Sequence, residues 1–190
     1  MNLNPKWHLH FLQMAELCAR MSRDPSTKVG AVIVGPDQEV RSTGFNGFPR
    51  GIADTEARLN DRDVKLKLVV HAEMNAVLNA VRVGGGALKG CALYLAATDT
   101  SGSVWGGPPC SRCTVEVIQA GITTIVSYPN KAVPSRWSED LVLSESLLAE
   151  AGVAYREVTW ASPTVKSCGE FEVTRRESEL RNTREGGIKK

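Results

Sequence analysis

The first hydrophobic pattern in the chain has a helical period and covers residues 5–21. It predicts an amphipathic helix whose core-facing side carries Trp7, Phe11, Met14, Cys18 and Met21. Polar residues around Pro25 end this helix. A continuous apolar run over residues 29–34 then predicts a strand buried on both faces, and a turn at 35–37 leads to a second strand over 40–44. We expect these two strands to form a hairpin.

Helices and strands alternate in the rest of the chain. Helical periodicity covers residues 54–68 and returns from His71 to about Val83, where three glycines end it. Beyond it the pattern predicts, in order, a strand over 93–97, a helix over 110–120, a strand over 122–127, a helix over 138–151 and a strand over 153–158. Helices that join the last three strands make them parallel, so the expected fold is an α/β, three-layer α-β-α sandwich with a mixed five-stranded sheet.

Two polar segments stand apart from this alternation. Residues 98–109 form a twelve-residue loop that contains Trp105 between glycines, and loops of this length are functional more often than short ones. After Ala161 the chain turns polar. Two charge pairs there are four residues apart and could support a surface helix: Glu172 with Arg176, and Glu177 with Arg181. Disorder is equally compatible with this composition. We expect one domain over residues 1–160 and a polar tail over 161–190.

Composition narrows the class of partner. Hydrophobic residues make up 42% of the 190 and charged residues 23%, which is ordinary for a globular protein. No apolar run approaches ~18 residues and no signal pattern begins the chain, so we expect a cytoplasmic protein without a membrane partner. The net charge of +2 comes from the tail, and the domain carries sixteen basic and sixteen acidic residues. A protein that binds a nucleic acid polymer would show a basic stripe, so a small substrate fits better.

Four residues are candidates for a catalytic metal site: His71, Glu73, Cys110 and Cys113. Two thiolates and one imidazole give zinc three protein ligands and leave the fourth position for water, as in a catalytic site. Zinc lowers the pKa of that water from about 15.7 to roughly 7. Glu73 follows His71 by about 200° around a helix, so it is near the metal without sharing the ligand's direction. It can take a proton from the water and hand it to a leaving amine.

Each of these residues has a simpler interpretation when taken alone. A Cys-x-x-Cys pair can be a redox pair or half of a structural zinc site, and a lone histidine is more often a surface or core residue. Together they favour catalysis, because His71 and Cys110 each open a helix beside the strand over 93–97. The chain offers no second Cys/His cluster that would close a four-ligand site. Packing or incidental roles explain the other cysteines, which are Cys18, Cys91 and Cys168.

Two further segments carry polar side chains of interest. The loop over residues 45–51 contains glycine and proline and carries Asn46, whose donor and acceptor suit a sugar or base edge. An ordinary Asn-Gly turn explains the same residue equally well. The helical segment over 54–68 carries basic residues that we expect to form a solvated face: Arg58, Arg62, Lys65 and Lys67.

Several runs of residues together match a known family. They are Ser22-Arg23-Asp24-Pro25, residues 28–34, Gly44-Phe45-Asn46-Gly47-Phe48-Pro49-Arg50-Gly51, His71-Ala72-Glu73 and Cys110-Ser111-Arg112-Cys113. Through these runs residues 14–157 resemble the cytidine/deoxycytidylate deaminase superfamily, and within it the deoxycytidylate (dCMP) deaminases most. The zinc motif H-x-E…P-C-x-x-C is common to zinc nucleobase deaminases and does not choose a substrate. The Ser-x-Asp-Pro and Gly-Phe-Asn-Gly motifs are what favour dCMP.

The resemblance implies a cytidine deaminase-like fold, one catalytic zinc per subunit and particular roles for residues. It makes His71, Cys110 and Cys113 the zinc ligands and Glu73 the catalytic residue. Substrate contacts are expected at Ser22, Arg23, Asp24, Asn46, Ala72 and Pro109, with Arg23 as the natural partner of a substrate phosphate. An allosteric nucleotide site for dCTP as activator and dTTP as inhibitor is expected at Gly44, Asn46, Gly47 and Arg50. Similar enzymes are commonly homo-oligomers, with a hexamer favoured.

The expected reaction is the zinc-dependent hydrolysis of dCMP to dUMP and ammonia, with attack at C4 of the cytosine ring. Two alternatives stay within the superfamily: deamination of a modified pyrimidine nucleotide or of a free nucleoside. A third is a catalytically silent nucleotide-binding module, for which Glu73 would have no use. An RNA-editing adenosine deaminase fits poorly with the neutral domain. Two departures from the family bear on substrate choice: the long approach to Cys110 over residues 101–107, and the tail, which has no counterpart.

Overall fold

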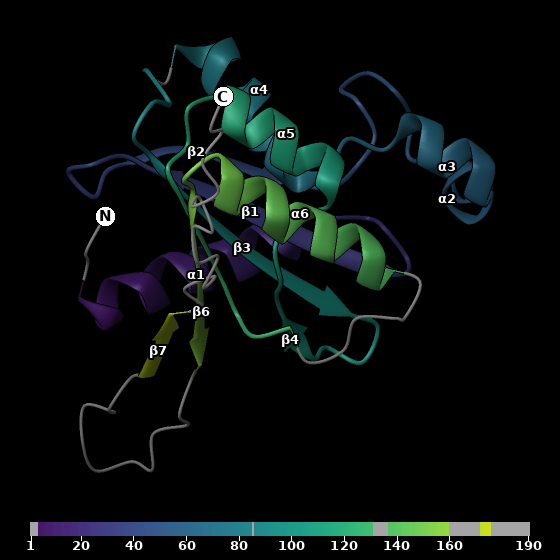
Figure 1. Ribbon diagram of the computed structural model, residues 1–190. Helices are drawn as coiled ribbons and strands as arrows, with labels where there is room; N and C mark the ends of the chain where they lie inside the picture. Colours follow the sequence, from purple (N-terminus) through teal and green to yellow (C-terminus); the bar gives the residue numbers. More distant parts are fainter. Residues whose placement is uncertain (1–3, 85, 131–136, 160–171, 176–190) are drawn as a thin grey trace, which may run out of the picture.

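A computed structural model describes residues 4–84, 86–130, 137–159 and 172–175 (Figure 1). Its strands form one mixed sheet in the order β2-β1-β3-β5-β6-β7, with the short β4 paired to β3. The strands are β1 (Thr27–Val34), β2 (Val40–Phe45), β3 (Ala92–Asp99), β4 (Val104–Trp105), β5 (Thr124–Ser127), β6 (Ala154–Thr159) and β7 (Glu172–Arg175).

The strand directions confirm the predicted topology. β1 and β2 are an antiparallel hairpin, and β1 also pairs antiparallel with β3. β3, β5 and β6 run parallel, as expected for strands joined through helices. The predicted mixed α/β sheet with helices on its two faces is therefore present, with β4 and β7 as additions to the five predicted strands.

Helices cover both faces of the sheet (Figure 1). α1 (Pro5–Ala19) packs on one face, and α4 (Ala72–Val83), α5 (Ser111–Gln119) and α6 (Ser138–Glu150) pack on the other. Side chains of β1 alternate between the two cores: Val32 lies in the core beneath α1, and Ala31 and Ile33 lie in the core beneath α4. This explains the unbroken apolar run, because both faces of β1 are buried.

Two glycines allow the helices to approach the hairpin closely. A Cβ atom at Gly30 would overlap the carbonyl oxygen of Ala15 in α1, and one at Gly44 would overlap the backbone of Ala72 and Ala76 in α4. The absence of a side chain at these two positions therefore sets how closely α1 and α4 sit on the sheet. Through Gly44, it also sets the position of the first turn of α4.

The predicted buried side of the first helix was partly wrong. Phe11 is buried, but Trp7 is 41% exposed and Met21 is 65% exposed and lies beyond the end of α1. The buried side consists of His8, Leu9, Phe11, Leu12, Ala15 and Ala19. The pattern of large apolar residues missed His8, whose buried ring is satisfied by a hydrogen bond of 2.9 Å between its Nδ1 atom and the Tyr94 hydroxyl.

Three irregular segments also differ from their predictions. Residues 54–68 form two helices, α2 (Glu56–Asn60) and α3 (Arg62–Leu68), because Asp61 leaves the helical conformation and caps α3 with its carboxylate. The predicted loop over 98–109 contains β4, which pairs with Ala97 and Thr98 of β3. Within the predicted polar tail, Glu172–Arg175 form the short strand β7 along β6. The other residues of 161–190 lie outside the described part.

None of the helices in the described ranges is long and apolar enough to cross a membrane.

Candidate metal centre and substrate cavity

The three predicted ligands meet where the amino termini of two helices converge. His71 is the N-cap of α4, Cys110 is the N-cap of α5, and Cys113 lies in the first turn of α5. The Nδ1 atom of His71 lies 3.4 Å from the Sγ atom of Cys110 and 3.3 Å from that of Cys113. All three ligand atoms lie within 4.8 Å of one another. The predicted convergence of two helix N-termini is confirmed.

This geometry fits zinc. A tetrahedral site with Zn–S bonds of about 2.3 Å and Zn–N bonds of about 2.0–2.1 Å separates neighbouring ligand atoms by roughly 3.5–3.8 Å. The two nitrogen–sulfur distances lie just below this range. Two thiolates and one imidazole are also a donor set that zinc favours, and three protein ligands leave a fourth position free. His71 faces both sulfurs through Nδ1, so Nδ1 is its ligand atom.

Hydrogen bonds within the cluster and burial shift the pKa of all three residues. The hydrogen bond to Cys110 raises the pKa of His71 to about 9, and the bond from Cys113 lowers the pKa of Cys110 to about 4. The same bond to Cys110, together with burial, raises the pKa of Cys113. Zinc binds thiolates and a neutral imidazole, so metal binding at this cluster releases protons.

Glu73 lies beside the cluster without joining it. Its side chain is buried, with the residue only 6% exposed, and burial raises the pKa of its carboxyl group. The thiol of Cys113 is close enough to hydrogen-bond to it. Its carboxylate is not among the gathered ligand atoms. A buried acid with a raised pKa next to a metal site is suited to take up and return a proton.

A cavity of about 270 Å³ adjoins the cluster. His71, Glu73 and Cys110 line it together with Ala72 at the start of α4. An apolar wall comes from Leu95, Ala96, Ala97, Trp105, Trp137 and Leu141. A mostly apolar pocket with a few polar groups at one metal site is the usual form of a small-molecule binding site.

The strand β4 brings Trp105 into this wall. Trp105 pairs with Ala97 and Val104 with Thr98, so the segment before Cys110 folds back along β3. Gly106 follows directly, and a Cβ atom there would overlap the backbone of Tyr128. Trp105 and its neighbours Gly106, Gly107 and Pro108 all line the cavity. The long approach to Cys110 therefore forms part of the pocket.

The predicted substrate residues of the Ser22–Pro25 segment lie in different surroundings. Ser22 is buried, donates to the carbonyl oxygen of Asn46 over 2.8 Å, and is not among the residues lining the cavity. Asp24 lines the cavity and accepts hydrogen bonds from the backbone of Ser26 and Thr27. Arg23 is exposed and is not among the described residues that line the cavity.

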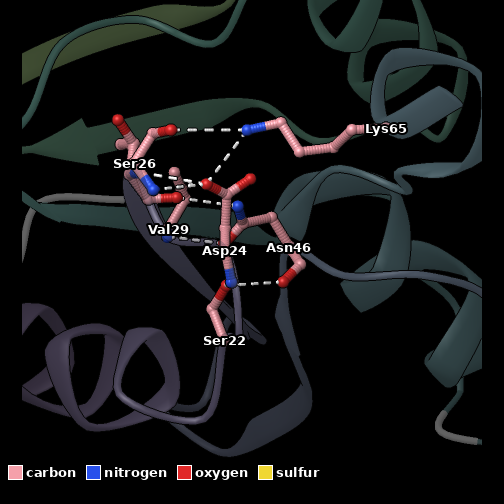
Figure 2. A network of polar contacts seen from close by, with 7 residues as sticks. Ser22, Asp24, Ser26, Val29, Asn46 and Lys65 are labelled. Carbon is pink, nitrogen blue, oxygen red and sulfur yellow. Dashed lines mark hydrogen bonds and ion pairs between the residues drawn. The ribbon is translucent and has the colours of Figure 1, made fainter. Parts of the chain in front are cut away.

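Asn46 combines a structural role with a place in the cavity wall. Its Oδ1 atom accepts from the backbone N–H of Val29 over 2.7 Å, and its Nδ2 donates to the carbonyl oxygen of Thr27 over 2.9 Å (Figure 2). These bonds hold its amide against β1 in one orientation. Of the other predicted substrate residues, Ala72 lines the cavity, and at the approach to α5 Pro108 does so rather than Pro109.

The residues of the predicted allosteric site lie along α4 and the segment just before it. Gly44 packs against the helix backbone, Gly47 forms a two-bond bridge with Val70, and Arg50 donates to Oδ1 of Asn79 over 2.6 Å. Of the four predicted residues, Asn46 lines the cavity. An effector site at this place stays a prediction.

Two basic residues of the cavity were missed by the sequence reasoning. Arg62 and Lys65 were expected on a solvated face, yet both line the cavity, with Leu66 and Val69 of the same segment. Their spacing of three residues places them on one side of α3. That spacing was readable in advance, but the position of α3 over the cavity was not.

Comparisons with known proteins agree with this site. Residues 5–128 match the cytidine and deoxycytidylate deaminase zinc-binding region. The chain is 39% identical over 156 residues to an uncharacterized deaminase in the luxG 3′ region of Aliivibrio fischeri, covering 82% of this chain and 93% of that protein. It is 33% identical over 159 residues to the deoxycytidylate deaminase of Mus musculus, covering 81% of this chain and 80% of the mouse protein.

The fold is also shared with a solved structure. The dCMP deaminase of the cyanophage S-TIM5, in complex with dCMP and dUMP, aligns with a TM-score of 0.60 at 22% identity. The alignment covers 81% of this chain and 98% of the phage chain.

Proposed function

The chain belongs to the cytidine and deoxycytidylate deaminase family, and we propose that its reaction is the hydrolytic deamination of dCMP to dUMP with release of ammonia. One observation carries this proposal: a relative named as a deoxycytidylate deaminase aligns over four-fifths of both chains. Zinc-dependent deamination follows from the family and the ligand triad. The choice of dCMP as substrate is the proposed part.

The residues of the cavity divide the chemistry among them. When bound to His71, Cys110 and Cys113, zinc supplies Lewis acidity that makes a water molecule acidic at neutral pH. Glu73 takes one proton from the attacking water and passes it to N3 of the cytosine ring. It then takes the second proton from the hydroxyl group now on C4 and passes it to the departing amine, so that C4 becomes a carbonyl and ammonia leaves. Burial supports this role, because it raises the pKa of the Glu73 carboxyl group and so makes it a better proton acceptor than an exposed carboxylate.

Rate measurements over a substrate panel test the proposal. The panel contains dCMP, dCTP, deoxycytidine and 5-substituted dCMP, and the measured quantity is ammonia release by the zinc-loaded protein. We expect kcat/KM to be highest for dCMP. A higher value for a 5-substituted dCMP or for deoxycytidine would replace dCMP with that substrate and leave the deaminase chemistry in place. No ammonia from any member would favour the silent binding module.

Regulation and assembly are predictions of their own. Repeating the dCMP assay with dCTP and with dTTP tests the expected activation and inhibition. Light scattering of the zinc-loaded protein tests the expected hexamer. A rate that neither nucleotide changes would remove the allosteric prediction without affecting the proposed reaction.

A further inference from the structure

The basic residues of α3 stand out in the cavity because nothing in the zinc chemistry uses them. Arg62 and Lys65 are the arginine and lysine among the described residues that line it. Figure 1 shows α2 and α3 beside the sheet layers rather than stacked on a face with α4, α5 and α6. α3 therefore contributes to the cavity wall with the side that carries these two cations.

Lys65 is held over the loop that enters β1. Its Nζ atom lies 3.3 Å from Oδ1 of Asp24 and 3.4 Å from Oγ of Ser26 (Figure 2). The side chains of Lys65 and Asp24 are only 15% and 11% exposed. Backbone N–H groups of Ser26 and Thr27 also donate to the same Asp24 oxygen, so Asp24 is fixed and in turn positions Lys65.

The two bonds of Lys65 leave it available to a ligand. A charge-assisted N–H···O bond is normally about 2.7–2.9 Å long, so bonds of 3.3 and 3.4 Å are weak. An ammonium group also has three donors, and these bonds use two. With Asp24 counted, the group of Asp24, Arg62 and Lys65 carries a net charge of +1 beside the cavity. Such a group attracts an anion.

We propose that Lys65 and Arg62 of α3 bind the 5′-phosphate of the nucleotide substrate, with Asp24 as the residue that positions Lys65. The proposal deepens the proposed function and rests on it for the identity of the substrate. The pyrimidine ring must reach the zinc ligands and Glu73, and the phosphate lies on the far side of the deoxyribose. The phosphate therefore requires a cation that lines the same cavity but is not one of the metal ligands. Lys65 and Arg62 meet both conditions.

The alternative phosphate partner is Arg23, which the family resemblance favours. Arg23 is exposed and outside the cavity lining, whereas Lys65 is largely buried at the cavity wall. A cation that is already partly desolvated and held in place loses less on binding a phosphate than a free surface arginine. The two assignments predict different variants to be sensitive, so one experiment separates them.

The experiment compares substrates with and without the phosphate. For the zinc-loaded protein and the variants Lys65→Met, Arg62→Gln and Arg23→Ala, kcat/KM is measured for dCMP and for deoxycytidine. We expect Lys65→Met to lower the ratio of the two values roughly 10- to 100-fold, as for the loss of a hydrogen bond between charged groups. Arg62→Gln should lower it less, because Arg62 is exposed. Lys65→Arg, which keeps the charge, should restore part of the ratio.

Lys67→Met is the matched control. Lys67 lies on the same helix, is exposed and is not among the residues lining the cavity. The same removal of one lysine charge there should change the ratio less than twofold. Equal losses in Lys65→Met and Lys67→Met would mean that only the overall charge matters and would overturn the proposal. A ratio that falls in Arg23→Ala but not in Lys65→Met would assign the phosphate to Arg23 instead.

Equilibrium binding separates this inference from the proposed reaction. Calorimetry with dUMP and with deoxyuridine measures the phosphate contact without turnover, and Lys65→Met should raise the dissociation constant of dUMP roughly 10- to 100-fold. Wild-type protein that binds dUMP no more tightly than deoxyuridine would overturn the inference. Protein that prefers dUMP through Lys65 but releases no ammonia from dCMP would overturn the proposed reaction alone.

Discussion

Glu73 is the residue on which the proposed chemistry depends. Its carboxylate is buried beside the cluster of His71, Cys110 and Cys113 but is not one of the gathered ligand atoms. Glu73→Gln keeps the shape of the side chain and removes its ability to carry a proton. We expect this variant to retain zinc, measured by elemental analysis, and to lose ammonia release by a factor of at least about 10²–10⁴. The exposed Glu150→Gln is the control. Normal turnover in Glu73→Gln would end the assignment.

His8 gives the protein a predictable dependence of stability on pH. It is 1% exposed, and burial lowers its pKa from 6.5 to about 4. In the unfolded chain His8 binds a proton near pH 6.5, and in the folded chain only near pH 4. The contribution of neutral His8 to stability is therefore fully present above pH 6.5 and is lost as the pH falls from 6.5 to about 4. At pH 5 the loss is about 2 kcal/mol at 1.36 kcal/mol per pKa unit.

Urea unfolding at pH 7 and pH 5 measures this loss. In His8→Gln the difference between the two pH values should shrink, while the exposed His10→Gln should keep it. An equal difference in wild type and His8→Gln would show that other groups cause the dependence.

At the scale of elements, Gly44 controls how α4 approaches β2. A Cβ atom there would overlap the backbone of Ala72 and Ala76, next to the ligand His71. We expect Gly44→Ala to lower the free energy of unfolding by about 1–3 kcal/mol, as overpacking does, and to weaken zinc retention. Denaturant unfolding and zinc content measure both effects. Gly47→Ala is the control, because its new Cβ would meet the Phe45 ring at 3.8 Å, an ordinary contact.

At the scale of the whole molecule, zinc should act as a link between two helices. α4 supplies His71 at its N-cap and α5 supplies Cys110 and Cys113 at its own start, so the metal joins segments that are 39 residues apart at the nearest ligands. Metal at 100 times its dissociation constant stabilises a protein by about 2.7 kcal/mol. A domain of this size gains about 2–4 °C per kcal/mol.

Removal of zinc by a chelator should therefore lower the midpoint of thermal unfolding by at least roughly 5 °C and abolish ammonia release. Added zinc should restore both, and added magnesium should restore neither, because magnesium prefers oxygen ligands. Purified protein without stoichiometric zinc would contradict the metal site directly.

The alternation of elements and the zinc ligands were predictable because each rests on local spacing. Apolar periodicity located the five main strands and the helices that join them, and His-x-Glu with Cys-x-x-Cys fixed the donor types. Features that depend on contacts between distant residues were not predicted. The buried ring of His8 hydrogen-bonds to Tyr94. Val104 and Trp105 form a strand by pairing with β3, and Glu172–Arg175 form one by pairing with β6.

Local sequence was enough to predict the order of elements, the metal-binding residues and a carboxylate two positions after the histidine. Tertiary packing was needed to show that His71, Glu73 and Cys110 line one cavity, that Trp105 forms part of its wall and that Lys65 lines it as well. The physical reason is that a side chain's donor type and its position along a helix are properties of the chain. Which side of α3 meets the cavity depends on how segments far apart in the sequence pack, and no local pattern carries that information.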